Sequence, residues 1–188
     1  MLFRSYQIHF LDYAVVMFHP VTTEFNEMER YADDFVNALL EDHHNYVVIY
    51  PNNDLGSQYI IDKFQKLKEN ARFRVFPSLR FEYFLSLLKN SQYIIGNSSA
   101  GIREAPYYGI PIINIGTRQQ NRAVHADIIN VDYSKNSIGK ALSIIDTHQV
   151  QPSLDDFGQG NSAALFLKSL TSETIWSINH QKKFRDSL

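Results

Sequence analysis

The segment at residues 96–101, which reads GNSSAG, combines small and hydroxyl-bearing residues in a pattern typical of a phosphate-binding turn. Glycine lets an anion approach the backbone closely, and the hydroxyls of Ser98 and Ser99 can donate hydrogen bonds. A helix that begins just after these serines would add free N–H groups and its positive dipole end. An ordinary capped strand-to-helix turn explains the composition equally well. The segment is neither GxGxxG nor a P-loop, so it indicates neither dinucleotide nor Walker chemistry, and we expect no cofactor.

Two charged side chains follow this turn at positions that could reach the same ligand. Glu104 would lie about a turn and a half into the helix, where a carboxylate can accept hydrogen bonds from ribose hydroxyls. The alternative is an acidic residue that complements the helix dipole. Arg118, in the sequence GTRQ, follows the next expected strand and so emerges at the same edge of the sheet. Its guanidinium could pair with a phosphate, or it could be an ordinary surface arginine.

Histidine residues offer further candidates. His19 directly follows the first expected strand and could donate a proton to a leaving phosphate or stabilise its negative charge. A lone histidine is more often structural, so both interpretations stay open. His43 and His44 adjoin at an expected helix end, but they lack the i, i+4 spacing of a helical metal-binding pair, so we expect no metal site. No Ser/His/Asp order or nucleophile elbow is evident, which argues against a hydrolase triad.

The composition is that of an ordinary globular protein and excludes several functional classes. The 188 residues are 44% hydrophobic and 20% charged, which suits one well-buried core. The formal net charge is -2 and the basic residues are scattered, so the electrostatic footprint of a nucleic-acid-binding protein is missing. The absence of cysteine removes disulfides and thiolate metal sites and fits a reducing compartment. No signal peptide or membrane span is recognisable, so we expect a cytoplasmic protein without a membrane partner.

Short apolar runs alternate with amphipathic segments along most of the chain. One helical stripe, beginning at Thr22 or Thr23 as a capping residue, steps by three and four through Phe25, Met28, Ala32, Phe35 and Leu39. Ser134 is the expected cap of a later helix. Connections between the runs are too long for hairpins, so the pattern predicts an α/β fold with a doubly wound, Rossmann-like parallel sheet. The expected strands are residues 13–18, 46–50, 72–76, 93–95 and 110–115, with residues 128–131 as a candidate for a sixth.

The alternation stops after residue 149, and a different C-terminal region follows. A loop with Pro152, Gly158 and Gly160 leads to a helical tail at about residues 162–188, with Ser162 as its expected cap. The tail could pack on the sheet domain or reach another body. We therefore expect one Rossmann-like domain over residues 1–188, which carries this tail.

With these residues in view, the chain resembles the C-terminal half of UDP-N-acetylglucosamine 2-epimerases. It is closer to the hydrolysing, sialic-acid-pathway branch. Non-hydrolysing bacterial enzymes tend towards an arginine-rich run after the histidine, where this chain has Pro20, and towards an Asp-Ser-Gly-Gly turn, where it has the triplet at 97–99. The resemblance rests on four blocks, which are HPVTTE at 19–24, GNSSAGIREAP at 96–106, GIPIINIGTRQ at 109–119 and FGQGNSA at 157–163.

The resemblance implies half of a two-domain fold like that of B-type glycosyltransferases, with a UDP-sugar in the cleft between the halves. Such enzymes eliminate UDP across C1–C2, re-protonate the 2-acetamidoglucal at C2, and add UDP or water at C1. By match to the motifs, Ser98 and Ser99 would hold the diphosphate, Glu104 the ribose and Arg118 the phosphate region. His19 would lie beside the leaving group, and the uracil near residues 76–79.

We also expect a departure from the family, namely that the N-terminal domain that carries the proposed C2 carboxylates is absent. Proton abstraction needs a base within hydrogen-bonding reach, so we expect this chain alone to bind UDP without completing catalysis. The alternatives are a non-catalytic nucleotide-sugar-binding fragment and a B-type glycosyltransferase domain. A flank left uncovered by the missing domain could be covered by self-association, which predicts a homo-oligomer.

Overall fold

Six short strands form one sheet in the computed structural model of the chain, which describes residues 6–122, 128–153, 157–178 and 181. Every neighbouring pair is parallel, as the long connections predicted. The candidate sixth strand is present at the edge of the sheet. The strands are β1 (Ala14–Met17), β2 (Tyr46–Ile49), β3 (Phe73–Phe76), β4 (Ile94–Gly96), β5 (Ile112–Ile115) and β6 (Ile128–Val131).

The strand order, β3-β2-β1-β4-β5-β6, confirms the doubly wound fold. The chain runs outward from β1 to β3, crosses to β4 on the other side of β1, and then runs outward again to β6. The order therefore reverses between β1 and β4, and a crevice forms at the carboxyl ends of these two strands. Open α/β sheets bind their ligands at this switch point.

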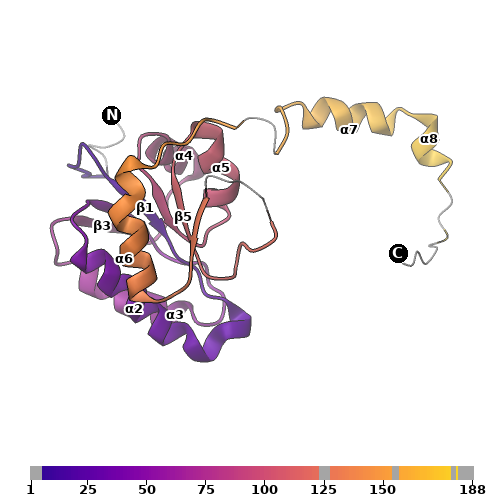
Figure 1. The fold of residues 1–188 in the computed structure, drawn as a ribbon. Helices are drawn as coiled ribbons and strands as arrows, with labels where there is room; N and C mark the ends of the chain where they lie inside the picture. Colours follow the sequence, from indigo (N-terminus) through magenta and orange to yellow (C-terminus); the bar gives the residue numbers. More distant parts are fainter. Residues whose placement is uncertain (1–5, 123–127, 154–156, 179–180, 182–188) are drawn as a thin grey trace. The chain divides into compact units, whose positions relative to one another are not determined.

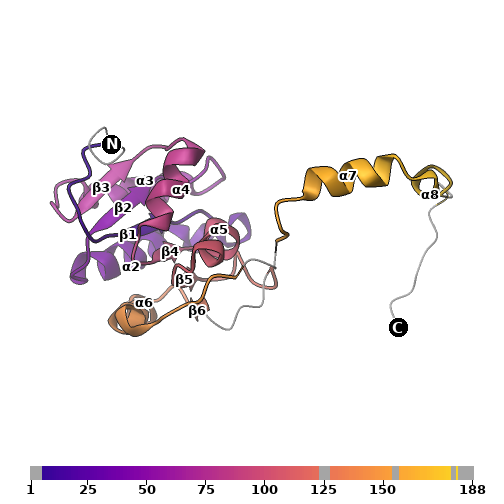
Figure 2. The ribbon, with the colours of Figure 1, turned by 90° about the horizontal axis from the view of Figure 1, so that it is seen from above.

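Helices cover both faces of the sheet (Figures 1 and 2). One buried cluster joins the strands to α2, α3 and α6, and α2 lies beside α6 (Figure 1). A second cluster joins the opposite face to α4 and α5. The helices of this part are η1 (Thr22–Glu27), α2 (Met28–Glu41), α3 (Ser57–Phe64), η2 (Gln65–Leu67), α4 (Phe81–Lys89), α5 (Ala100–Tyr108), α6 (Lys135–Ile144) and η3 (Ile145–Thr147).

The helix starts agree only in part with the capping residues that the sequence suggested. Ser134 caps α6, because its Oγ accepts a hydrogen bond from the Ser137 backbone N–H at 3.3 Å. Thr22 and Thr23 do not cap α2 but form the start of the 3-10 turn η1. The threonine-cap prediction was wrong because η1 supplies a backbone turn ahead of α2, which begins six residues after Thr22.

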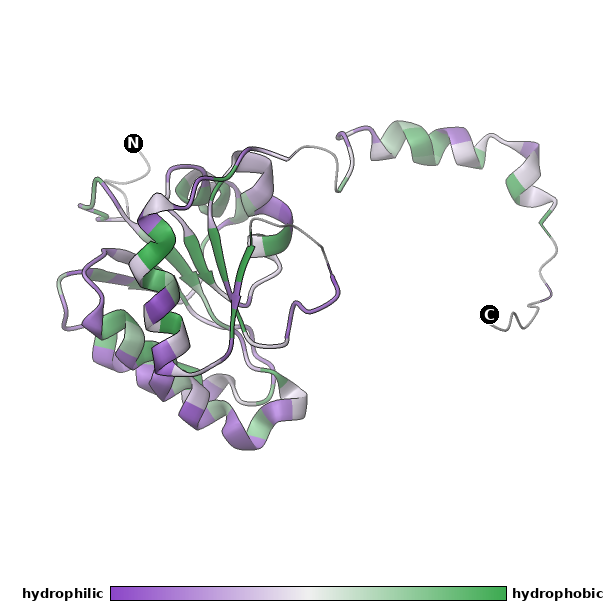
Figure 3. Cartoon of the chain, in the orientation of Figure 1, coloured by the Kyte–Doolittle hydropathy of each residue, from purple (hydrophilic) through white to green (hydrophobic). Residues whose placement is uncertain are grey.

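The chain divides into two compact units, residues 1–153 and residues 154–188. The second unit holds the expected helical tail as α7 (Ser162–Leu170) and α8 (Glu173–Trp176). Ser162 lies inside α7 and Asn161 occupies the capping position without a side-chain hydrogen bond, so the Ser162 cap was wrong. The exposed surface of α7 is strongly apolar (Figure 3), with Leu165, Phe166 and Leu167 each more than half exposed.

Within the described part of the chain, each helix is too short or too polar to cross a bilayer.

Candidate functional site

The switch point is built on a glycine that lets β1 and β4 approach each other. Gly96 ends β4 with φ at +138°, and a Cβ there would lie 2.0 Å from the carbonyl oxygen of Met17. Only glycine fits this close approach without displacing backbone. The next backbone N–H, that of Asn97, donates to the same Met17 oxygen at 3.1 Å. The phosphate-binding turn therefore starts directly against the end of β1.

Asn97 fastens the loop after β1 to the turn after β4. The side chain is fully buried, and its carboxamide forms both of its contacts with the backbone of His19. Oδ1 accepts from the His19 N–H at 2.6 Å, and Nδ2 donates to the His19 carbonyl oxygen at 2.8 Å. This pairing fixes His19 relative to the serines that follow Asn97.

The imidazole of His19 is buried and held in one tautomer. A backbone N–H can only donate, so the contact of 3.1 Å from the Asn52 nitrogen makes Nδ1 of His19 an acceptor. In the neutral ring the proton then sits on Nε2. Burial and, to a smaller extent, the nearby Arg118 lower the pKa of His19 to about 4, against an opposing effect of Asp54. His19 is therefore a neutral N–H donor at pH 7.

Arg118 and Gln119 reach the same turn from the loop after β5. Gln119 Nε2 donates to the carbonyl oxygen of Asn97 at 2.8 Å, and Arg118 Nη1 donates to that oxygen at 3.3 Å. Burial lowers the pKa of Arg118, the neighbouring Arg122 lowers it further, and Asp54 opposes both. Arginine nevertheless stays charged in proteins, so Arg118 is a cation beside the turn at Asn97.

The other three predicted site residues line one cavity of about 280 Å³. Ser98 and Ser99 come from the turn and Glu104 from α5, while the remaining lining is mostly apolar. The Ser98 hydroxyl accepts from the Ala100 N–H at 3.3 Å, which places it at the first turn of α5. The apolar lining residues are Met17, Ile49, Leu79, Phe81, Phe84 and Ala100.

The five predicted residues thus fall into two adjacent groups at one sheet edge. Ser98, Ser99 and Glu104 share the cavity, whereas His19 and Arg118 lie outside its lining. The backbone and side chain of Asn97 join the two groups.

A further contact joins two blocks that are far apart in the sequence. Thr117 Oγ1 donates to Glu24 Oε1 at 2.6 Å, which ties the loop after β5 to the turn η1. The preceding Gly116 has φ at +71°, and a Cβ there would lie 2.0 Å from the ring of Tyr133. The Thr117 N–H donates to the Tyr133 hydroxyl at 3.3 Å. This packing holds Arg118 and Gln119 in place.

Sequence reasoning missed the roles of Asn52, Asn97 and Gln119. Asn52 follows β2, so the rule that carboxyl ends of parallel strands share an edge places it near His19. Asn97 was part of the predicted turn, but a buried carboxamide that pairs with a neighbouring loop leaves no signal in residue spacing.

The family model of UDP-N-acetylglucosamine 2-epimerase matches residues 3–171 of this chain. A UDP-N-acetylglucosamine 2-epimerase from Neisseria meningitidis is 41% identical over 184 residues, which are 96% of this chain and 48% of that protein. A UDP-N,N'-diacetylbacillosamine 2-epimerase (hydrolyzing) from Legionella pneumophila is 28% identical over 125 residues, or 66% of this chain and 33% of that protein. The chain thus spans less than half of either relative.

The fold also resembles a solved structure. The crystal structure of Methanocaldococcus jannaschii UDP-GlcNAc 2-epimerase in complex with UDP-GlcNAc and UDP aligns with a TM-score of 0.70. The alignment is 20% identical and covers 90% of this chain and 48% of that one, so it supports the fold alone. The match of the family model over most of the chain is what assigns the family. The chain belongs to the UDP-N-acetylglucosamine 2-epimerase family.

Proposed function

We propose that this chain is the UDP-binding half of a UDP-N-acetylglucosamine 2-epimerase. The observation that carries the proposal is the position of Asn97, which joins His19 and Arg118 to the Ser98–Ser99 turn at the switch point of the sheet. A nucleotide diphosphate needs cations, N–H donors and hydroxyls within a few ångströms of one another, and this edge of the sheet offers all three.

The positions of the side chains support the following binding roles. Ser98, Ser99 and the start of α5 would bind the diphosphate, with Arg118 on its other side. Glu104 would accept hydrogen bonds from the ribose hydroxyls in the same cavity. The apolar wall, which includes Leu79 and Phe81, would contact the uracil ring.

The chemistry proposed for the complete enzyme is an elimination followed by an addition. A base from the other half removes the proton at C2, the C–H electrons form the C1=C2 double bond, and UDP leaves from C1 with its bonding electrons. His19 stabilises the leaving phosphate with its Nε2–H; as a neutral ring it acts as a hydrogen-bond donor rather than as a strong acid. The alkene is then protonated at C2 from the opposite face.

The last step decides between two products. Addition of water at C1 gives free ManNAc, whereas re-addition of UDP gives UDP-ManNAc. We propose the hydrolysing outcome, which is supported by the Asn97-Ser98-Ser99 triplet and by the Legionella relative whose name includes "hydrolyzing".

An assay with UDP-GlcNAc tests the proposal, with this chain alone and with an N-terminal half of a family member supplied as a second polypeptide. We expect free UDP and ManNAc only when both halves are present. UDP-ManNAc as the product would contradict the hydrolysing outcome. UDP binding without turnover in the reconstituted pair would indicate a non-catalytic module, and turnover that requires a sugar acceptor would indicate a glycosyltransferase.

A further inference from the structure

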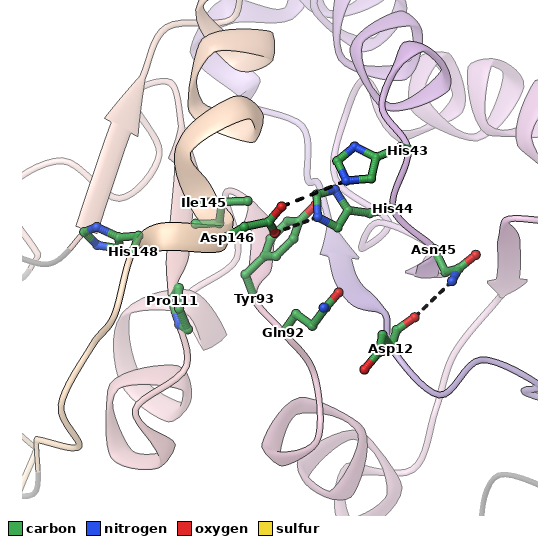
Figure 4. A pocket seen from close by; sticks show the side chains of 10 residues that line it. All are labelled: Asp12, His43, His44, Asn45, Gln92, Tyr93, Pro111, Ile145, Asp146 and His148. Carbon is green, nitrogen blue, oxygen red and sulfur yellow. Dashed lines mark hydrogen bonds and ion pairs between the residues drawn. The ribbon is translucent and has the colours of Figure 1, made fainter.

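A second polar cluster lies at the amino ends of the strands, opposite the carboxyl ends where the candidate nucleotide site lies. Asp42 and the two histidines His43 and His44 connect the end of α2 to β2, and Asp146 comes from η3. Both imidazoles face Asp146 in the close view of this region (Figure 4). A cavity of about 500 Å³ opens beside them.

The two imidazoles lie between the two carboxylates. His44 contacts Asp42 Oδ2 through Nδ1 at 2.7 Å and Asp146 Oδ1 through Nε2 at 2.8 Å. His43 lies against His44 with ring centroids 4.1 Å apart. Its Nδ1 is 3.6 Å from Asp42 Oδ1 and its Nε2 is 3.9 Å from Asp146 Oδ2. Each carboxylate therefore offers one oxygen to each ring.

The inner half of this cluster is buried and supported. The side chains of His44 and Asp42 are 5% and 8% exposed. Asp42 Oδ2 also accepts from the Tyr46 hydroxyl at 2.6 Å and from the His44 backbone N–H at 2.9 Å. Asp42 Oδ2 therefore has three hydrogen-bond donors around it, two of them from His44, and we assign Asp42 the role of orienting His44. The outer half, His43 and Asp146, is 78% and 53% exposed and can be reached from solvent.

This arrangement has the chemistry of a transition-metal site. Imidazole nitrogen and carboxylate oxygen are ligands of Zn²⁺ and its neighbours, and tetrahedral bonds of about 2.0–2.2 Å place ligand atoms roughly 3.3 Å apart. Asp146 lies 2.8 Å from His44 Nε2 through Oδ1 and 3.9 Å from His43 Nε2 through Oδ2, and these two distances bracket that separation. A metal-bound histidine usually gives its other ring N–H to a carboxylate, which is the position of Asp42 behind His44.

We propose that His43, His44 and Asp146 bind one divalent transition-metal ion of the zinc class, with Asp42 as the carboxylate that orients the histidines. One nitrogen from each histidine lies within 4.8 Å of the other and of an Asp42 oxygen, and each histidine also contacts Asp146, at 2.8 Å for His44 and 3.9 Å for His43. We expected no metal because His43 and His44 lack the i, i+4 spacing of two ligands on one helix. That criterion does not exclude a site whose ligands come from different segments of the chain. The third ligand comes from a segment 102 residues after His44. The ion would tie the start of β2 to the end of α6 and would be separate from the nucleotide site.

The test uses the full chain without a polyhistidine tag, stripped with a chelator and titrated with Zn²⁺ by calorimetry and with Co²⁺ by absorption spectroscopy. We expect one ion per chain, and at least about tenfold weaker binding in His43→Ala and in Asp146→Asn. His43 is largely exposed, so His43→Ala should keep the fold, which circular dichroism checks. His148→Ala is the matched control, because His148 lines the same cavity on the far side of Asp146 (Figure 4) and should leave the affinity unchanged.

Two results would overturn the proposal. One is the absence of stoichiometric zinc binding at about 100 µM metal, which would leave the cluster as an ion pair around a protonated His44. The other is binding that His43→Ala and Asp146→Asn weaken no more than His148→Ala does, which would mean that the metal binds elsewhere.

Discussion

The backbone N–H of Asn52 donates to Nδ1 of His19 at 3.1 Å, so the buried neutral imidazole carries its proton on Nε2. Asn97 fixes the backbone of the same histidine through two hydrogen bonds. The ring thus has its position and its tautomer set by residues from two different loops. A preorganised neutral donor of this kind suits the stabilisation of a departing phosphate.

The buried state of His19 predicts that stability falls in acid. Its pKa is about 4 in the native protein and about 6.5 when unfolded, so between these values the unfolded chain binds more protons. The free energy of unfolding should therefore fall as the pH drops from about 6.5 to about 4, by up to about 3 kcal/mol. Urea unfolding at several pH values measures this loss.

His19→Asn is the matched variant for that experiment, because an amide oxygen can accept from Asn52 but has no proton to gain in this range. We expect the variant to lose most of the pH dependence between about pH 6.5 and 4. An unchanged slope in the variant would show that His19 does not titrate as its burial predicts.

Gly96→Ala should disrupt the switch point. Its positive φ disfavours any side chain, and the new Cβ would meet the Met17 carbonyl oxygen at 2.0 Å. We expect a loss of at least about 3 kcal/mol in the free energy of unfolding, measured by urea denaturation. Gly139→Ala is the control, since it lies in α6 with open space around it and should be stabilising by roughly 0.5–1 kcal/mol. Equal effects of the two substitutions would contradict this account of β1 and β4.

Thr117→Val should loosen the contact between the loop after β5 and η1. The substitution keeps the shape but removes the donor to Glu24 Oε1, and Glu24 Oε2 is buried without a partner among the described residues. We expect a loss of about 1–3 kcal/mol and weaker UDP binding, because Arg118 follows directly. Thr147→Val, which removes an exposed hydroxyl from η3, should change neither quantity. Thermal melting of both variants measures the change in stability, and UDP titration measures the change in affinity. Equal values for the two variants would contradict the prediction.

The parallel sheet could be predicted because its signal is local. Buried strands such as β1 and β2 read as continuous apolar runs, and the long connections exclude hairpins. The capping residues were predicted correctly only for α6, since whether a hydroxyl faces a free N–H depends on the turn before it. In the tail, α7 was expected, but residues 179–180 and 182–188 of the predicted helical region lie outside the described part.

The candidate site could be predicted only as a set of positions. His19, Ser98 and Arg118 follow three strands that end at one edge, and sequence order alone predicts this. The grouping around Asn97 depends on side-chain rotamers in the folded core, for which residue spacing carries no signal. The cluster of His44 and Asp146 was missed for the same reason, because its members come from different segments of the chain.

Calorimetric titration of the chain with UDP tests the central claim most directly. We predict saturable binding of one UDP, weakened at least about tenfold by Arg118→Ala and measurably by Ser98→Ala, because each removes a donor to the diphosphate. Arg30→Ala, an exposed arginine on α2 that pairs with Glu27, should leave the affinity unchanged. No binding at millimolar UDP, or binding that all three variants leave intact, would contradict the assignment of this sheet edge as the UDP site.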